Sequence, residues 1–443
     1  MIEHDIIAAP ATTLGGAIAV IRLSGEGAIE CCDAIFRGRK RLADVGSHTV
    51  HYGEIADGER VIDDVLVAVF RAPHSYTGED SVEISIHGSR YIASEVIGLL
   101  CRHGARPARA GEFSMRAFAA GKIDLSQAEA VADIIAADSR AAHAMASTQM
   151  RGGYSESLRE LRGRLLNITS LLELELDFSE EDVEFADRTR LKSMLDETCA
   201  TVGRLMESFR TGNAIRNGIR VAIVGAPNVG KSTLLNRLVE DDRAMVSDIA
   251  GTTRDTIEEE VVIDGIRFRF IDTAGLRDTD DKLERMGIER SHKAIETAQV
   301  IIRMVEPTAK SAETFASNEG QAREIVVVNK IDTSEQRNID GAIYISAREN
   351  IGIDELRKAL CNTIDTEGLY RGDVIVSNAR HYDALSRAHY GIERAIAGLA
   401  DGISSEMLSE DIRTTIDALG EITGEITSDE ILGNIFSKFC IGK

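Results

Sequence analysis

The sequence predicts a multidomain α/β protein, and three observations support this fold class. At 443 residues the chain is too long for a single hydrophobic core, so two or three domains are expected. Between residues 213 and 368, short apolar runs followed by turn residues predict strands that alternate with helices, as in a mostly parallel sheet. On both sides of this region the apolar residues recur at helical spacing. The α/β region is therefore predicted to be inserted into a helical domain.

Residues 225–232, with the sequence GAPNVGKS, form the most informative motif of the chain. They follow an apolar run at 221–224 and precede a helical pattern at 233–237. A glycine-rich loop between a strand and a helix offers backbone N–H groups and a helix N-terminus to a phosphate chain. In such a loop Lys231 reaches the β- and γ-phosphates and Ser232 binds Mg²⁺. The alternative, a glycine-rich turn with a chance lysine, does not account for the flanking strand and helix.

Three further motifs, each at the end of a predicted strand, identify the nucleotide as GTP. Asp272-Thr273-Ala274-Gly275 places an aspartate at a strand end, where it can face Mg²⁺. In Asn329-Lys330-Ile331-Asp332 the carboxylate can accept both N–H groups of the guanine edge, a donor pair that adenine lacks. Ser346-Ala347 follows the next strand. One such tetrapeptide alone is common in turns, but the four motifs in this order predict a GTPase domain.

The residues that support hydrolysis differ from those of many small GTPases. Leu276 occupies the position after Gly275 where many such proteins carry a glutamine that orients the attacking water. A carboxylate of the acidic stretch 278–284 can replace it as general base or through a bridging water, or this stretch is a solvated loop. Asn228 can coordinate a monovalent cation in place of an arginine finger, or it stabilises the turn. Residue types alone leave both questions open.

Composition and charge limit the classes of protein that remain. No apolar run approaches the length of a membrane span, and no secretory signal begins at Met1. The six cysteines are scattered without metal-ligand spacing, which predicts a reduced, cytoplasmic protein. The formal net charge of −22 argues against broad, nonspecific nucleic-acid binding, although a local basic patch can still dock a structured RNA.

Patterning predicts four segments along the chain. These are a mixed α/β domain at 1–120, a helical domain at 121–212, the GTPase domain at 213–368 and a second helical part at 369–443. In the first segment the alternation in 81–88 places Glu83, Ser85 and His87 on one strand face, which is either a ligand site or simply solvent-exposed. In the second, one helical stripe carries Leu158, Leu161, Leu165, Ile168 and Leu172.

Several segments outside the GTPase motifs are distinctive. They are 9–12 (APAT), 21–25 (IRLSG), 76–80 (YTGED), 111–114 (GEFS), 116–118 (RAF), 124–130 (DLSQAEA), 421–425 (EITGE) and 439–443 (FCIGK). With them the chain resembles the MnmE (TrmE) family of tRNA-modification GTPases over almost its full length. The resemblance implies an N-terminal domain that binds tetrahydrofolate and forms the dimer, a helical domain, and an inserted Ras-like P-loop GTPase domain.

The resemblance also implies a biochemical activity. Members of the family are K⁺-dependent GTPases that work in a hetero-oligomer with a flavin-dependent MnmG-type partner. Together they add an aminomethyl or carboxymethylaminomethyl group to C5 of the wobble uridine of certain tRNAs. A tetrahydrofolate derivative (5-formyl- or 5,10-methylene-) supplies the one-carbon unit, and the N-terminal domain makes the homodimer. The implied cofactors are therefore Mg²⁺, K⁺ and this folate.

Carried over by position, the resemblance assigns the site residues. Ser232 and Thr253 would bind Mg²⁺, and Glu284 would be the catalytic acid that positions the attacking water through a bridging water. The K⁺ ligands would be Asn228, Ser247, Ile249 and Thr252. The GTP-binding residues would be Asn228, Val229, Gly230, Lys231, Ser232, Thr233, Ser247, Asp248, Ile249, Ala250, Gly251, Thr252, Thr253, Asp272, Thr273, Ala274, Gly275, Asn329, Lys330, Asp332, Ser346, Ala347 and Arg348. The folate site would comprise Arg22, Glu83, Lys122 and Lys443.

Cys440 and the overall function each have an alternative. In the family Cys440 lies near the folate pocket, so a catalytic role is conceivable, but we favour a partly buried packing cysteine. A K⁺-dependent GTPase of ribosome assembly would share Asn228 and Leu276, although such proteins carry a second G domain or an RNA-binding tail. A GTP-gated scaffold without modification chemistry is the other alternative, and the state of the wobble uridine distinguishes them.

Overall fold

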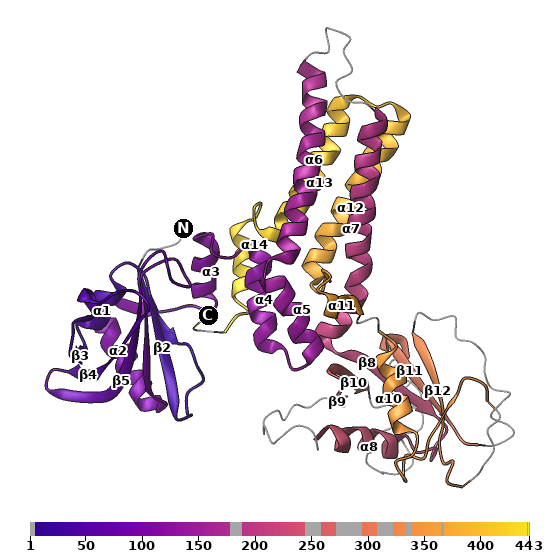
Figure 1. Cartoon of the computed structure of the whole chain (residues 1–443), viewed down its shortest axis with the longest axis horizontal. Helices are drawn as coiled ribbons and strands as arrows, with labels where there is room; N and C mark the ends of the chain where they lie inside the picture. Colours follow the sequence, from indigo (N-terminus) through magenta and orange to yellow (C-terminus); the bar gives the residue numbers. More distant parts are fainter. Residues whose placement is uncertain are drawn as a thin grey trace. The chain divides into compact units, whose positions relative to one another are not determined.

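The computed structural model describes residues 5–177, 188–243, 258–271, 295–307, 322–333, 339–364, 367–440 and 442. The chain forms two compact units (Figure 1). Unit 1 comprises residues 1–132, 150–163 and 416–443, and unit 2 comprises residues 133–149 and 164–415. Helices α6 (Gly153–Asp177) and α13 (Ser405–Thr423) are each shared between the units. The four segment boundaries stay predictions, although helix α7 (Arg188–Asn217) continues beyond the boundary expected at 212.

Unit 1 is built on a seven-stranded sheet with the order β3-β4-β5-β6-β2-β1-β7. Its strands are β1 (Ile6–Pro10), β2 (Ile18–Ser24), β3 (Phe36–Gly38), β4 (Thr49–Asp57), β5 (Arg60–Phe70), β6 (Ser81–His87) and β7 (Ala105–Pro107). Neighbouring strands are antiparallel except β1 and β7. Helices α1 (Ala28–Asp33) and α2 (Arg90–Arg102) and the 3₁₀ helix η1 (Leu42–Asp44) pack on its apolar face. The mixed α/β fold predicted for the N-terminal segment is confirmed.

The two faces of the unit 1 sheet follow from alternation along each strand. In β6, Val82, Ile84 and Ile86 are buried in the core, whereas Glu83 and His87 lie on the opposite face. This is the pattern that period-two alternation predicts, because successive side chains of a strand point to opposite faces. The polar face of β6 is therefore available to solvent, a ligand or another chain.

Helices from both ends of the sequence complete unit 1. Helix α3 (Glu112–Ala119) and the start of α4 (Leu125–Ala136) pack against the C-terminal helix α14 (Asp429–Phe436), as Figure 1 shows. The ring centroids of Phe118 and Phe436 are 6.4 Å apart. This packing brings the C-terminal segment beside the N-terminal sheet.

The helical part of unit 2 is held by packing between long helices. Helix α7 packs against α12 (Ala379–Asp401), where the rings of Phe209 and Tyr382 stack at 4.5 Å. Helix α12 approaches α13 closely at Gly391, where any Cβ would lie 2.4 Å from the hydroxyl of Thr415. All five apolar residues of the predicted stripe in α6 are buried, which confirms its helical period. The remaining helices here are α5 (Arg140–Met150) and α11 (Glu367–Arg371).

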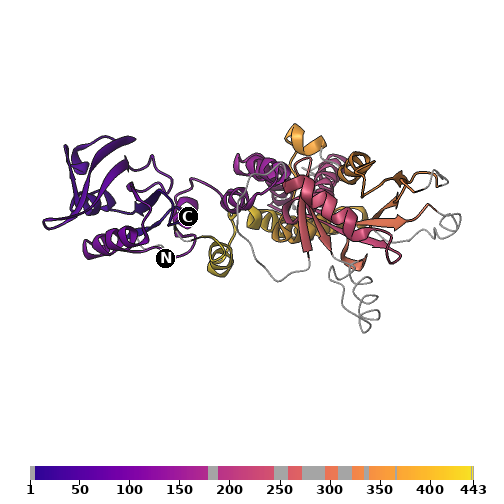
Figure 2. The same cartoon turned by 90° about the horizontal axis from the view of Figure 1, so that it is seen from below.

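The GTPase part of unit 2 is a six-stranded sheet with the order β13-β12-β11-β8-β10-β9. Its strands are β8 (Ile219–Gly225), β9 (Glu258–Ile263), β10 (Ile266–Ile271), β11 (Val300–Val305), β12 (Arg323–Val328) and β13 (Ile343–Tyr344). All neighbours are parallel except β9 and β10. Helices α8 (Lys231–Arg243) and α10 (Ile353–Cys361) pack beside the sheet (Figures 1 and 2). The mostly parallel sheet predicted between 213 and 368 is confirmed.

Candidate functional site

The phosphate loop lies where the topology of the parallel sheet changes direction. After β8 the chain passes through α8 to β9 and β10 on one side of β8, whereas β11 and β12 lie on the other side. In open parallel sheets, ligands bind outside the carboxyl ends of the strands at such a switch point. The loop 225–230 leaves β8 at that end and leads directly into α8. The fold thus places the motif where a nucleotide is expected.

The backbone of the loop fits a phosphate chain. Gly230 has φ +102°, and a Cβ there would lie 2.3 Å from Nδ2 of Asn329, so only glycine fits. The ammonium group of Lys231 donates to the carbonyl oxygens of Gly225 at 2.9 Å and Ala226 at 3.0 Å, which holds it across the loop. Ser232 and Thr233 are exposed in the first turn of α8, where N–H groups without helical partners bind anions. Val229 is buried and anchors the loop in the core.

Asn329 connects the phosphate loop to the loop expected to contact guanine. Its Nδ2 donates to the carbonyl oxygen of Val229 at 2.8 Å, and its Oδ1 accepts from the N–H of Ala347 at 3.0 Å. The residue is 3% exposed, so both bonds are shielded from water. Sequence reasoning treated Asn329 as a nucleotide contact only, and the structure adds this connecting role.

Asp332 is positioned by a serine from the next motif. The hydroxyl of Ser346 donates to Oδ1 of Asp332 at 2.7 Å and accepts from the N–H of Glu349 at 3.2 Å. Ser346 is itself fixed by a backbone pair with Ile351. Asp332 is exposed, and within the described residues its Oδ2 has no hydrogen-bond partner. A carboxylate oriented in this way can accept the N–H donors of a guanine edge.

Two neighbouring residues complete this part of the site. Lys330 has a left-handed backbone, and its ammonium group lies 2.5 Å from a carboxylate oxygen of Glu306. Arg348 is exposed, and its carbonyl oxygen accepts from Arg237 of α8 at 3.3 Å. The predicted residues of the third and fourth motifs therefore converge at one end of the sheet.

Asn228 is the only predicted K⁺ ligand among the described residues. Its backbone is left-handed, with φ +62°, a conformation that asparagine tolerates in turns. Its side chain is exposed and makes no hydrogen bond to any described residue, so the turn depends on its backbone rather than its amide. The other predicted site residues of this domain lie outside the described residues: Ser247, Asp248, Ile249, Ala250, Gly251, Thr252, Thr253, Asp272, Thr273, Ala274, Gly275 and Glu284.

Unit 1 carries a second candidate site on its sheet. Arg22 of β2 and Glu83 of β6 are register partners, and Nη2 of Arg22 lies 2.8 Å from Oε1 of Glu83. The guanidinium carbon of Arg22 lies 5.6 Å from the ring centroid of Tyr76 and 5.8 Å from that of Phe113. Nε of Arg22 also donates to Oε1, so within the described residues Oε2 of Glu83 has no partner. A cation, the exposed ring of Tyr76 and a carboxylate oxygen thus meet on this face of the sheet, whereas Phe113 is buried.

Of the two other predicted residues of this site, Lys122 belongs to the described part of the chain. The Lys122 side chain passes Gly78, where a Cβ would lie 3.3 Å from Cε of the lysine. The C-terminal segment reaches β1, because a Cβ on Gly442 would lie 2.0 Å from the carbonyl oxygen of Pro10. Lys443 lies outside the described residues. Three of the four predicted folate residues therefore belong to unit 1 as described.

Cys440 differs from the expectation of a packing residue. Its side chain is exposed, although its carbonyl oxygen accepts from the N–H of Gly111 at 3.5 Å. The apolar packing in this segment is provided instead by Phe436 and Phe439, which are buried against Leu125. The expectation failed because a lone cysteine carries no helical or strand period that would show which way it points.

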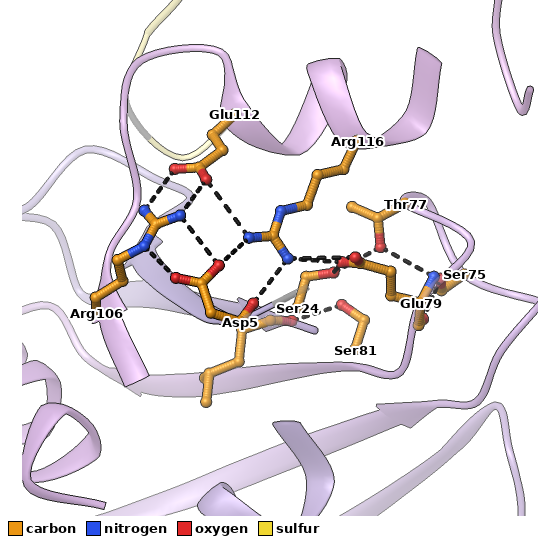
Figure 3. A network of polar contacts seen from close by, with 10 residues as sticks. Asp5, Ser24, Ser75, Thr77, Glu79, Ser81, Arg106, Glu112 and Arg116 are labelled. Atoms are coloured by element: carbon orange, nitrogen blue, oxygen red, sulfur yellow. Dashed lines mark hydrogen bonds and ion pairs between the residues drawn. The ribbon is translucent and has the colours of Figure 1, made fainter. Parts of the chain in front are cut away.

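A buried ionic network that sequence reasoning missed supports this second site (Figure 3). Arg116 of α3 has a side chain only 1% exposed; it lies 2.7 Å from Asp5, 3.1 Å from Glu79 and 3.4 Å from Glu112. Arg106 of β7 pairs with Glu112 at 2.6 Å and with Asp5. The network joins Asp5, just before β1, to β7, to α3 and to the loop before β6. The same loop carries Tyr76. The charged residues of the 76–80 and 111–118 motifs were the available sequence signal.

The network shifts the pKa of its acids. Burial raises the pKa of Asp5, but hydrogen bonds from Arg106 and Arg116 outweigh it and leave the pKa below its usual value. Burial likewise raises the pKa of Glu112. Hydrogen bonds from Arg106 and from the N–H of Arg109 outweigh this effect, so the pKa is lowered overall. Both carboxylates are therefore ionised partners of the two arginines.

The described residues contain neither a membrane-spanning helix nor a cluster of metal ligands. None of the described helices is both long and apolar enough to cross a membrane. The described His, Cys, Asp and Glu side chains include no group of three arranged to hold a metal ion. A Mg²⁺ held by Ser232, Thr253 and phosphate oxygens would not require such a group.

Comparison with known proteins finds relatives that match the chain over nearly its full length. A family model described as the MnmE helical domain matches residues 125–440, and one described as the GTP-binding protein TrmE N-terminus matches residues 6–122. A protein of Cytophaga hutchinsonii named "tRNA modification GTPase MnmE" is 48% identical over 451 residues, 99% of this chain and 98% of that protein. One of the same name from Flavobacterium johnsoniae is 49% identical over 466 residues and covers 100% of both. A solved Era variant from Aquifex aeolicus is 29% identical over 39% of this chain and 65% of that chain, with a TM-score of 0.25.

The parallel sheet, the glycine-rich loop at its switch point and the oriented Asp332 define a P-loop GTPase. The family models and the full-length relatives show to which family of GTPases the chain belongs. The chain belongs to the MnmE family.

Proposed function

We propose that this GTPase acts in tRNA modification and, with a flavin-dependent MnmG-type partner, adds an aminomethyl or carboxymethylaminomethyl group to C5 of the wobble uridine. The observation that carries the proposal is that relatives named for tRNA modification match the chain over 99% and 100% of its length. A ribosome-assembly GTPase would not need the Arg22–Glu83 site of unit 1. The six free cysteines support a cytoplasmic location.

Within the GTPase, each described residue has a role that its geometry supports. The loop N–H groups and Lys231 would bind the phosphates, Ser232 with Thr253 would hold Mg²⁺, and Asp332 would select guanine. The metal neutralises charge on the phosphates when it is bound. Glu284 would position the attacking water, since Leu276 has no polar atom.

Asn228 supports the proposal that the GTPase depends on K⁺. Its amide oxygen is exposed beside the phosphate loop and is not used by the turn within the described residues. The oxygen can therefore serve as a cation ligand, with Ser247, Ile249 and Thr252 as the other proposed ligands. A cation at this position would supply the positive charge that an arginine finger provides in other GTPases.

The site of unit 1 fits a tetrahydrofolate derivative, and we propose that it binds one. Arg22 holds Oε1 of Glu83 and so fixes the carboxylate. Within the described residues Oε2 has no partner, and it can accept from the N–H donors of a pterin ring. The exposed ring of Tyr76 offers aromatic surface near this pair, and the buried ring of Phe113 packs near the Arg22 guanidinium. Lys122 and Lys443 would contribute cations for the acidic tail of the folate. The folate supplies the one-carbon unit when bound.

The same sheet face supports a homodimer through the N-terminal domain. Val50, Tyr52 and Leu66 are large apolar residues, and they are 64%, 68% and 49% exposed. Tyr52 pairs in register with Leu66, so the three form a continuous patch on β4 and β5. Exposed apolar patches of this kind mark contact surfaces. Ala68 of β5 is the register partner of both Val50 in β4 and Glu83 in β6, so the apolar patch and Glu83 share one face of the sheet. A partner chain on this patch would therefore lie next to the proposed folate site.

Calorimetry with 5-formyltetrahydrofolate tests the second site separately from the first. Removal of residues 440–443 should abolish folate binding, because it deletes Gly442, which approaches Pro10 closely, together with the proposed ligand Lys443, and it should leave GTP turnover largely intact. Glu83→Gln should also weaken folate binding, whereas Glu95→Gln, in α2 where the side chain pairs with Arg60, should not. Unchanged folate affinity in the truncated protein would contradict the assignment.

A further inference from the structure

A cavity of unit 2 lies at the edge of the GTPase sheet opposite the phosphate loop. Its volume of about 520 Å³ is in the range of small-molecule sites. It is lined by Arg210, Thr211 and Ala214 of α7, Ile219 of β8, Gln299 and Val300 at the start of β11, Ala322 and Arg323 at the start of β12, and Thr363 and Ile364 after α10. The parallel strands β8, β11 and β12 begin at this cavity and end on the side of the phosphate loop. The two sites are therefore distinct.

The lining selects an anion with an apolar part. Ala214, Ile219 and Val300 are buried members of the core and form an apolar wall. Arg210 and Arg323 bring two guanidinium groups, and none of the described residues that line the cavity carries a carboxylate. Guanidinium groups bind carboxylates and phosphates through paired hydrogen bonds. A cavity with this lining is unfavourable for a cation and favourable for an anion.

Arg323 is held in place by the protein before any ligand binds. Its Nη1 donates to the carbonyl oxygen of Asn362 at 2.8 Å. Its backbone N–H donates to the carbonyl oxygen of Gln299 at 3.0 Å. Nε and Nη2 of Arg323 make no hydrogen bond to a described residue of the chain. A positioned guanidinium with remaining donors loses little rotamer freedom when it binds an oxyanion.

The uncharged polar groups of the lining are also oriented. Oε1 of Gln299 accepts from the N–H of Arg220 at 3.0 Å, which leaves Nε2 as a donor. The hydroxyl of Thr363 donates to the carbonyl oxygen of Leu360 at 2.6 Å, which leaves its lone pairs as acceptors for a ligand hydroxyl. The cavity thus combines donors for an oxyanion with an acceptor for a neutral polar group.

We propose that this cavity binds a small organic phosphate about the size of a nucleoside monophosphate. Its phosphate pairs with Arg210 and Arg323, and its body packs against Ala214 and Ile219. Two guanidinium groups match the nearly two charges and three terminal oxygens of a phosphate monoester better than the single charge of a carboxylate. The ligand bridges the last turns of α7 and the strands of the GTPase sheet.

The test uses the full-length protein saturated with GDP and Mg²⁺, so that the nucleotide site is occupied, and titrates adenosine 5′-phosphate by calorimetry. Saturable binding of one equivalent per chain is expected. Arg323→Gln should weaken it about tenfold or more, because a charge-assisted pair is lost. Arg204→Ala removes an exposed arginine of α7 outside the cavity and should bind like the wild type. GTP turnover close to wild type would show that each variant is folded.

A second variant covers the case in which Arg323→Gln does not fold. Thr211→Glu places a carboxylate in the cavity from a partly exposed helical position and should abolish binding of adenosine 5′-phosphate by repulsion. Absence of saturable binding to the wild type at millimolar concentrations would overturn the proposal. Equal weakening by Arg323→Gln and Arg204→Ala would overturn it too, because binding would then reflect overall charge rather than this cavity.

Discussion

The side-chain amide of Asn329 lies 2.8 Å from the carbonyl oxygen of Val229 and ties the guanine loop to the phosphate loop. The same side chain accepts from the N–H of Ala347 at 3.0 Å. One buried residue therefore holds three loops that end different strands of the sheet. The geometry of base recognition and that of phosphate binding depend on each other through this residue.

Asn329→Ala should lower GDP affinity about tenfold or more and reduce thermal stability. The substitution leaves the buried carbonyl of Val229 and the N–H of Ala347 without partners, and each loss costs about 1–3 kcal/mol. Titration with a fluorescent guanine nucleotide measures the affinity. Asn236→Ala, at an exposed position of α8, is the matched control and should bind as the wild type does. Wild-type affinity in Asn329→Ala would show that the loops hold their positions independently.

Asp332→Asn should weaken GTP binding and improve binding of xanthosine triphosphate. The loss of a charge-assisted pair costs about 1.5–3 kcal/mol, or about tenfold and more in affinity. Asparagine can still accept from Ser346, so the loop itself should remain folded. Competition binding with both nucleotides is the measurement, with the exposed Glu349→Gln as control. Equal GTP affinity in Asp332→Asn and wild type would remove Asp332 from the base site.

GTP hydrolysis should be fast in K⁺ and slow in Na⁺, and the difference should disappear in Asn228→Ala. Sodium has a smaller radius and fits a loop of carbonyl ligands less well. Alanine strains the left-handed backbone of Asn228, so Asn228→Gly, which accepts φ +62° without strain, should show the same loss. Turnover rates in the two salts are the measurement. A rate indifferent to the exchange of the two ions would exclude the cation site.

Arg116→Met should destabilise unit 1 by about 1.5–3 kcal/mol, because it removes the charge-assisted hydrogen bonds of a buried guanidinium, although Arg106 still pairs with Asp5 and Glu112. Urea denaturation at neutral pH measures the effect, and Arg109→Ala, at an exposed position of the same segment, should stay close to wild type. A loss below 1 kcal/mol, the value typical of a surface pair, would show that the network is not structural.

The same network predicts a sign for the pH dependence of wild-type stability. The pKa values of Asp5 and Glu112 are lowered from ordinary values of 3.8 and 4.5. Their contribution is therefore fully present above those ordinary values and is lost as the pH falls through the lowered values of the folded state. In Arg116→Met the acid-induced loss should be smaller. An identical pH profile in both proteins would contradict this account.

The GTPase site could be predicted further from sequence than the site of unit 1. Strand, loop and helix follow each other within a few residues around Lys231, so local patterns determine where that motif lies. Arg22 and Glu83 are 61 residues apart and meet only because β2 and β6 pair in register. Alternation placed Glu83 on the open face, but no pattern within one strand specifies its neighbour. Long-range pairing is the information that a single sequence does not contain.

The contacts that sequence analysis did not predict also depend on pairing between distant segments. Arg116 was noticed only as part of a motif, and its partners Asp5 and Glu79 come from other segments. The exposure of Cys440 likewise depends on how α14 ends against α3, not on the residues next to it. The sequence thus predicts the chemistry that lies within one segment and leaves the contacts between segments to the structure.

The central claim, that this GTPase acts in modification of the wobble uridine, is tested most directly by mass spectrometry of tRNA nucleosides. The comparison is between a strain that lacks the gene and the same strain complemented with wild type or with Asn329→Ala. The account predicts that the C5-modified uridine is lost on deletion, restored by the wild type and restored incompletely by Asn329→Ala. An unchanged level of the modified nucleoside in the deletion strain would contradict it.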